Sequence, residues 1–130
     1  MIYNENYFIE ISQRKGYIIM AKKIILFDLD GVLNMYDGNY DGNYIPPIKD
    51  GAYNLIKELS EKYRIIIFTA RNILSVSKWV FENGLDEYVE NVTNVKVPAY
   101  LIIDDRCINF NGNYADLTKE IKDFKTWYQK

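Results

Sequence analysis

The stretch of residues 24–33, IILFDLDGVL, constrains the fold of this chain more than any other. A short apolar run of β-prone residues leads directly into Asp28 and Asp30, and Gly31 follows at once. Such a run is typical of a strand buried in a parallel sheet, and open α/β sheets bind their ligands at the carboxyl ends of their strands. Two carboxylates at a buried strand end are costly unless a cation or a reaction requires them. The stretch therefore predicts an α/β fold with a functional site directly after this strand.

The spacing of these two acids favours a metal site. Side chains alternate along an extended strand, so Asp28 and Asp30 can point the same way. The backbone carbonyl of Asp30 supplies a further oxygen, and oxygens are the ligands that Mg²⁺ prefers. We therefore expect Mg²⁺ as the cofactor.

Two later apolar runs also end in polar residues. Residues 65–69, IIIFT, finish on a threonine hydroxyl, and residues 100–103, YLII, run into Asp104 and Asp105. Lys96 lies in the loop before the second of these runs. The order along the chain is therefore strand–Asp-x-Asp, strand–Thr, Lys, strand–Asp-Asp.

This order resembles the haloacid dehalogenase (HAD) superfamily of phosphohydrolases, over roughly residues 22–128. The local sequence LIIDDR followed by INF resembles that of small HAD phosphatases without a cap domain, which are common in bacteria and phages. The resemblance implies a three-layer α/β/α Rossmann-like fold with a mainly parallel sheet. It places the first strand centrally, between the strands that end at Thr69 and Asp104. It also implies a small flap at residues 34–47 and no cap domain.

The resemblance implies a role for each motif residue. Asp28 is the expected nucleophile, which attacks phosphorus to form an aspartyl-phosphate and so divides one hard step into two. Asp30 is the expected general acid and then base. Thr69 is expected to donate to a phosphoryl oxygen, and Lys96 to set a positive charge against Asp28 and the phosphate.

The metal ligands are expected among the same acids. Adjacent acids at a strand end repel each other, and Mg²⁺ relieves that repulsion while it neutralises phosphoryl oxygens. We expect Asp104 to bind the ion together with Asp28 and the Asp30 carbonyl, and Asp105 to bind through a metal-bound water. Which of Asp104 and Asp105 touches the ion directly stays open at this stage.

Four further residues are candidates for contacts with substrate. Arg71 follows the threonine motif, and Tyr36, Tyr40 and Tyr44 lie in the flap, where they could stack on a sugar or a base. A small phosphorylated compound is the expected substrate. A polynucleotide end is also open, because Asp-Asp-Arg recurs in the phosphatase part of phage polynucleotide kinases. The net charge of −2, however, gives no basic surface for nucleic acid.

A phosphate-binding or phosphoryl-accepting regulatory module is the alternative function. Response-regulator receivers also combine an acid pair, an aspartate, a threonine and a lysine on a doubly wound sheet. In receivers the acid pair comes first and the lysine last, whereas here Asp-x-Asp comes first and Lys96 precedes the acid pair. This order favours the hydrolase. An HAD-like protein that binds without catalysis is a third possibility, which the presence of every motif acid disfavours.

The composition excludes several other classes of chemistry. The chain contains no histidine, which rules out a histidine nucleophile, a histidine metal site and phosphohistidine chemistry. Its single cysteine, Cys107, rules out an internal disulfide and fits a reducing cytoplasm. No apolar run approaches the ~20 residues that a membrane span needs, so no membrane partner is expected. Nothing in the sequence indicates an oligomeric state.

The length of 130 residues fits one catalytic domain with a short extension. Residues 1–21 form the N-terminal extension, in which partial alternation at residues 8–11 suggests a strand, and residues 22–130 form the catalytic domain. Translation starting at Met20 is an alternative, because the codons of residues 14–16 can resemble a ribosome-binding site.

Apolar periodicity predicts three helices in the catalytic domain. The first covers residues 51–62 behind Asp50 as its N-cap. The second covers residues 74–83 and stops at Gly84, and the third covers residues 114–128. The third helix is expected to carry one apolar stripe, made of Leu117, Ile121, Phe124 and Tyr128.

Overall fold

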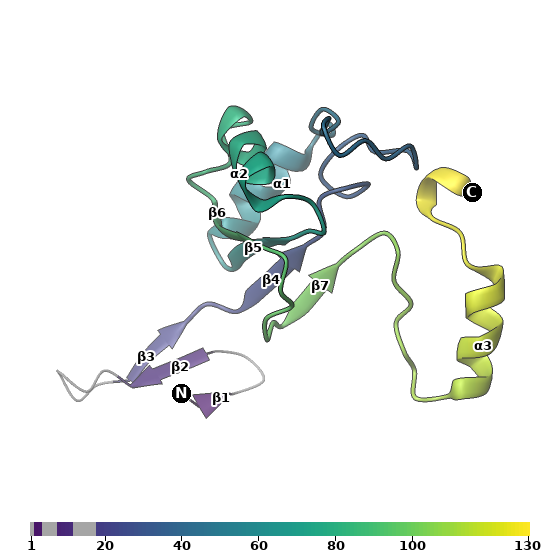
Figure 1. Ribbon diagram of the computed structural model, residues 1–130. Coiled ribbons are helices and arrows are strands. Elements are labelled where there is room, and N and C mark those ends of the chain that lie inside the picture. The colour runs from purple at the N-terminus through teal and green to yellow at the C-terminus, as the bar shows by residue number, and fades with distance from the viewer. Residues whose placement is uncertain (1, 4–7, 12–17) are drawn as a thin grey trace.

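The computed structural model describes residues 2–3, 8–11 and 18–130, with side chains from Lys22 onward. Its centre is a four-stranded parallel sheet in the order β6-β5-β4-β7 (Figure 1). The strands are β4 (Ile24–Phe27), β5 (Arg64–Phe68), β6 (Val89–Thr93) and β7 (Leu101–Ile103). β4 pairs in parallel with β5 on one side and with β7 on the other. The predicted Rossmann-like α/β sheet, with the first motif strand inside it, is thus confirmed.

Two helices cover one face of this sheet. α1 (Ala52–Ser60) and α2 (Ile73–Glu82) lie on the same side of the strands in Figure 1. They form one apolar core with the side chains that β4 and β5 direct toward them, and the fully buried members of this core include Phe27, Ile56, Ile67 and Val76. Because interiors of this kind are close-packed, the core fixes the strand ends and the motif residues behind them.

The opposite face of the sheet carries a smaller apolar cluster. Leu26 and Ile66 are buried there, and Val97 and Ala99 from the loop after β6 pack against them. α3 (Tyr114–Asp123) stands beyond the β7 edge of the sheet rather than on this face (Figure 1). α3 is described throughout, and none of its side chains is buried. The third helix therefore adds little to the main core.

The helix ends differ from the sequence prediction in two places. α1 is capped by Gly51 at φ 86° without a side-chain hydrogen bond, so the prediction of Asp50 as N-cap is wrong. This left-handed conformation is one that glycine adopts without a Cβ clash. α3 ends before Phe124, whose backbone is extended at φ −62° and ψ 133°. Tyr128 therefore leaves the predicted stripe and lies in a 3₁₀ turn, η1 (Trp127–Gln129).

The N-terminal extension forms a sheet of its own. It consists of the antiparallel strands β1 (Ile2–Tyr3), β2 (Phe8–Ile11) and β3 (Ile18–Ala21). The predicted strand at residues 8–11 is confirmed, whereas residues 14–16, on which the alternative start depends, lie outside the described residues. Among the helices that the structure describes, none is long and apolar enough to cross a bilayer.

The connection from β4 to α1 forms the predicted flap beside the strand ends. It is irregular apart from an isolated antiparallel bridge between Asn34 and Ile48. The side chains of Asp37 and Asp41 accept hydrogen bonds from the N–H groups two residues further on, at 3.3 and 2.8 Å, which makes two local Asx turns. In the described chain no folded cap domain interrupts this connection or the one from β5 to β7, which α2 and β6 fill.

Candidate active site

Three carboxylates meet where β4 and β7 end. Asp28 follows β4, and its N–H donates to the Ile103 carbonyl of the neighbouring strand at 2.9 Å. Asp104 and Asp105 follow β7, and one oxygen of each of the three carboxylates lies within 4.8 Å of the others. The parallel pairing of the two strands brings together acids that are 76 or more residues apart in sequence, as the residue numbers show. The structure thus joins three of the four predicted metal-ligand residues through their side chains.

Asp105 is held tightly against the turn that follows β4. Its Oδ2 is buried and accepts no hydrogen bond from an N–H or hydroxyl group of the described residues. The Asp105 side chain has a hydrogen bond with the Asp28 carboxyl, which a cation would replace. A Cβ on Gly31 would collide with this carboxylate, and Gly31 has φ 80°, so both space and backbone require glycine there. Asp104 differs, since its Oδ1 accepts the Arg106 N–H at 2.8 Å. A buried carboxylate oxygen without such a donor is the atom that gains most from a cation.

Burial, together with the two neighbouring acids, raises the pKa of Asp28 to about 8. Burial is the main cause, and the charges of Asp104 and Asp105 add to it. The pKa of Asp105 is raised as well, again chiefly by burial. The three side chains offer hard oxygen ligands only, which suits a cation such as Mg²⁺. A divalent ion at this point would reverse the electrostatic penalty, so the residues present fit the predicted metal.

The Asp30 carboxylate makes a different set of contacts from these three. Its Oδ2 accepts from Arg71 Nε at 2.7 Å, and its Oδ1 accepts from Asn34 Nδ2 at 3.0 Å. Each carboxylate oxygen can accept a second hydrogen bond, so the Asp30 carboxylate keeps free acceptor positions. Its assignment as a metal ligand through the backbone carbonyl stays a prediction.

Arg71 joins Asp30 to the flap. It is only 4% exposed, and its Nη1 donates to the carbonyls of Asp41 at 2.8 Å and Tyr44 at 3.1 Å. The ring of Tyr40 lies 4.7 Å from the guanidinium carbon. Nη2 of Arg71 is buried and has no hydrogen-bond partner among the described residues. Arg71 therefore organises the site, and its predicted contact with substrate stays a prediction.

Thr69 lies at the end of β5 with its hydroxyl partly engaged. The side chain is buried, its N–H donates to Thr93 at 3.0 Å, and its Oγ1 accepts the Arg71 N–H at 3.1 Å. A hydroxyl that accepts one bond still has its proton to donate. The geometry is thus compatible with the predicted donation to a phosphoryl oxygen.

Lys96 is not joined to the acids. It is exposed in the loop between β6 and β7, and its ammonium makes no hydrogen bond or ion pair within the described part of the chain. No lysine contributes to the pKa shift of Asp28. The role predicted for Lys96 stays a prediction.

The flap tyrosines fall into two kinds. Tyr40 and Tyr44 are 63% and 56% exposed. Tyr36 is half-buried, and its ring meets that of Tyr128 edge-on with centroids 6.2 Å apart. Two flap rings are thus available to a ligand, and one belongs to an internal aromatic contact.

Asn34 is a site residue that the sequence reasoning missed. It is fully buried, and its Oδ1 accepts the N–H groups of Gly31 and Tyr36, both at 3.1 Å, while its Nδ2 holds Asp30. The signal that could have revealed it is the Asn three residues after the motif glycine, since asparagine side chains often bond the neighbouring backbone.

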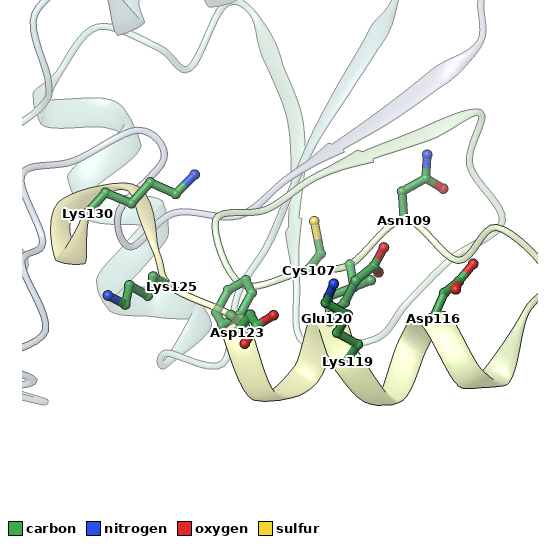
Figure 2. A pocket seen from close by; sticks show the side chains of 10 residues that line it. Cys107, Asn109, Asp116, Lys119, Glu120, Asp123, Lys125 and Lys130 are labelled. Atoms are coloured by element: carbon green, nitrogen blue, oxygen red, sulfur yellow. The ribbon is translucent and has the colours of Figure 1, made fainter.

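A separate hollow lies between α3 and the segment that precedes it (Figure 2). Its lining mixes both signs of charge, with Asp116, Lys119, Glu120, Asp123 and Lys125 among the residues shown. None of the motif residues lines it. This hollow is therefore distinct from the acidic cluster and is not the site that the motifs predict.

Comparison with known proteins supports the fold alone. No protein-family model matches the chain, and no curated protein does either. A solved structure of a conserved protein from Bacteroides thetaiotaomicron is similar, with a TM-score of 0.53 and 20% sequence identity. The match covers 83% of this chain and 96% of that one.

Proposed function

We propose that this protein is a Mg²⁺-dependent phosphatase that hydrolyses a phosphomonoester through a phospho-aspartate on Asp28. The observation that carries the proposal is the meeting of Asp28, Asp104 and Asp105 within 4.8 Å at the ends of adjacent parallel strands. The HAD-like order of the motifs supports it, since the order assigns a nucleophile, an acid and a metal site to these same positions.

The carboxylates of Asp28, Asp104 and Asp105 and the carbonyl of Asp30 would hold the ion. When bound, Mg²⁺ neutralises charge on the phosphoryl oxygens and on the acid cluster. The buried oxygen of Asp105, which accepts from no N–H or hydroxyl group of the described residues, makes this residue at least as good a direct ligand as Asp104. The sequence left open whether Asp104 or Asp105 binds the ion directly, and this buried oxygen favours Asp105.

In the first step, an Asp28 oxygen attacks phosphorus and the bond from phosphorus to the leaving oxygen breaks. Asp30 gives its proton to that leaving oxygen, so the alcohol departs neutral. Arg71 and Asn34 hold the Asp30 carboxylate in one orientation for this transfer. The product of the step is phospho-Asp28 and the free alcohol.

In the second step, water attacks the phosphorus of phospho-Asp28. Asp30, now a carboxylate, takes a proton from the water, and the bond between phosphorus and the Asp28 oxygen breaks. Inorganic phosphate leaves, and Asp28 and Asp30 return to their starting states. The Thr69 hydroxyl would donate to a phosphoryl oxygen in both steps.

A phosphatase screen tests this proposal. Wild type, Asp28→Asn and Asp30→Asn would be assayed with and without Mg²⁺ on p-nitrophenyl phosphate, sugar phosphates, nucleotides and a 3′-phosphorylated oligonucleotide. We expect Mg²⁺-dependent release by the wild type, no release by Asp28→Asn, and a loss of about 10²–10⁴-fold in Asp30→Asn. The exposed Asp50, which caps no helix, gives the matched control Asp50→Asn. Full activity in Asp28→Asn would refute the mechanism.

A phosphoryl-accepting or phosphate-binding module without turnover is the second candidate. The observation that favours it is the exposed position of Lys96, away from Asp28. Such a module would take up at most one phosphoryl group per chain, whereas a phosphatase releases many phosphates per chain. Counting phosphate released against protein present therefore distinguishes the two candidates.

A further inference from the structure

The C-terminal segment (Thr126–Lys130) returns to the motif that begins the catalytic domain. The indole Nε1 of Trp127 donates to the Gly31 carbonyl at 2.7 Å, although 96 positions separate the two residues. Figure 1 shows the C-terminus turning back from α3 toward the flap. The segment thus lies against the turn that carries Asp30.

Tyr128 lies beside the carboxylates themselves. A Cβ placed on Gly31 would lie 3.4 Å from Cε1 of Tyr128 and would also meet the Asp105 carboxylate, so the two side chains flank the same point. The Tyr128 hydroxyl accepts from Arg106 Nη2 at 3.0 Å. Its ring meets Tyr36 and Trp127 edge-on. Tyr128 is therefore part of the wall next to the metal-ligand acids.

Local contacts fix this segment in place. The Thr126 N–H donates to the Gln129 side chain at 3.0 Å in a capping box, and Thr126 is only 2% exposed. The ammonium of Lys49 lies 3.7 Å from the centre of the Trp127 ring. Such contacts reduce the ordering that a ligand would otherwise have to impose.

A second aromatic side chain flanks the site from the flap. The exposed ring of Tyr40 lies over Arg71, which in turn holds Asp30 at 2.7 Å. Tyr40 is therefore near Asp30 because both contact Arg71. Tyr128 is near Asp30 because it lies beside Gly31, the next residue in the chain. No folded cap domain stands beside them in the described chain, so these two rings are aromatic surfaces that the protein offers near Asp30.

The polar groups of Trp127 and Tyr128, the two aromatic residues of this wall, already make hydrogen bonds within the protein. The Trp127 N–H is bonded to Gly31, and the Tyr128 hydroxyl is bonded to Arg106. What the wall offers a ligand is chiefly aromatic surface, with the Arg106 cation at its edge. Such a surface suits a planar ring better than a polyhydroxylated sugar, which needs free donors and acceptors.

We propose that the C-terminal segment is a wall of the active site, and that Tyr128 and Tyr40 select phosphate monoesters whose leaving group carries a planar ring. This inference rests on the proposed phosphatase function. The ring is that of an aryl group or a nucleobase, since both present the same flat face. Stacking on one aromatic side chain contributes about 5- to 150-fold in binding.

The test compares kcat/KM for ring-bearing and aliphatic esters in the full-length protein with Mg²⁺. The ring-bearing esters are p-nitrophenyl phosphate and nucleoside 5′- and 3′-monophosphates, and the aliphatic ones are glycerol phosphate and glucose 6-phosphate. We expect wild type to prefer the ring-bearing esters, and the better of the aryl and nucleoside arms identifies the source of the ring. Tyr128→Ala should raise KM for those esters about 5- to 150-fold, and Tyr128→Phe should restore the preference because it keeps the ring.

Two further variants keep the test interpretable. Tyr40→Ala removes an exposed flap ring without disturbing the core, and it should reduce the same preference even if Tyr128→Ala does not fold. Tyr114→Ala removes a ring on α3 that is even more exposed than that of Tyr40, and it should leave the preference unchanged. Turnover with an unaltered ratio in both Tyr128→Ala and Tyr40→Ala overturns this inference and leaves the phosphatase proposal intact. No Mg²⁺-dependent turnover of any ester by wild type overturns both.

Discussion

At the residue scale, Asp28 combines a half-buried position with two acidic neighbours. Its pKa is raised to about 8, chiefly by burial and then by the charges of Asp104 and Asp105. The proposed mechanism needs an ionised Asp28, whereas a pKa of about 8 favours the protonated carboxyl at neutral pH in the metal-free protein. The same cluster that disfavours the free carboxylate could hold a cation, and in the proposed mechanism this would couple ionisation of Asp28 to Mg²⁺ binding.

The first prediction concerns stability and pH. The pKa of Asp28 lies above its ordinary value of 3.8 in the folded state, so the folded protein binds more protons than the unfolded chain between pH 3.8 and about 8. By linkage, the metal-free protein loses stability as the pH rises through this window. In EDTA, we expect the melting temperature of wild type to fall as the pH rises, and that of Asp28→Asn to fall less. Mg²⁺ should raise the melting temperature of wild type more at pH 8 than at pH 5. An equal fall of the melting temperature with pH in wild type and Asp28→Asn would contradict this prediction. Asp50→Asn serves as the control.

The second prediction concerns the ion pair between Arg71 and Asp30. Both side chains are largely removed from water, at 3% and 20% exposure, so removal of one partner strands a charge. Arg71→Ala should lower the free energy of unfolding by about 3–5 kcal/mol. Lys78→Ala breaks the exposed pair with Glu82 and should change it by less than about 0.5 kcal/mol. Urea denaturation measures the free energy of unfolding of both variants. Equal losses would show that the ion pair of Arg71 with Asp30 stabilises the fold no more than the exposed pair does.

At the element scale, the helices differ in what they contribute to the core. α1 buries Ile56 completely against the sheet, whereas α3 leaves Ile121 62% exposed. The two isoleucines have the same side chain and both lie within a helix, so they form a matched pair for measuring the difference.

The third prediction uses this pair. Ile56→Ala should reduce the free energy of unfolding by about 2–5 kcal/mol, because it leaves a cavity under α1. Ile121→Ala should change it by about 0.5 kcal/mol or less, as for other surface positions. Chemical denaturation of the two variants checks the contrast. A loss at Ile121 comparable to that at Ile56 would mean that α3 packs on a core in solution.

Sequence patterns predicted these elements with uneven success. The apolar runs predicted β4, β5 and β7, and the motif order placed β4 between the other two, because buried strands and their polar ends leave a local signal. The cap of α1 was predicted wrongly, since Asp50 has the right chemistry but Gly51 occupies the capping position. The helical period also continues through Phe124 and Tyr128, although the helix ends before Phe124.

The early end of the helix goes together with a contact between distant residues. The chain turns after α3, and Trp127 reaches the Gly31 carbonyl 96 positions away. No local pattern encodes such a bond. The same holds for the link from Asn34 and Arg71 to Asp30, which depends on the folded flap. The acids of the site could thus be predicted from sequence, whereas the side chains that hold and enclose them could not.

At the scale of the whole molecule, the C-terminal segment contacts the turn after β4 through the indole hydrogen bond of Trp127 to Gly31 and through the edge-on contact of Tyr128 with Tyr36. The C-terminal segment therefore helps to stabilise the turn that carries Asp30. It also places Tyr128 beside the Asp105 carboxylate, on one side of the acid cluster.

The fourth prediction tests this tie. Trp127→Phe removes the donor to the Gly31 carbonyl and keeps an aromatic ring, so it should lower the free energy of unfolding by about 1 kcal/mol. Tyr114→Phe on α3 is the control and should leave it unchanged. Denaturant titration followed by circular dichroism measures both variants. An unchanged free energy in Trp127→Phe would mean that the bond contributes nothing to the fold.

The central claim is that Asp28 carries the phosphoryl group during turnover. The most direct measurement is to quench wild type with acid while it turns over p-nitrophenyl phosphate with Mg²⁺, digest it, and locate the phosphoryl group by peptide mass spectrometry. The account predicts an adduct on the peptide that contains Asp28, lost when Mg²⁺ is omitted and absent from Asp28→Asn. A phosphoryl group on any other residue, or continued turnover by Asp28→Asn, would contradict it.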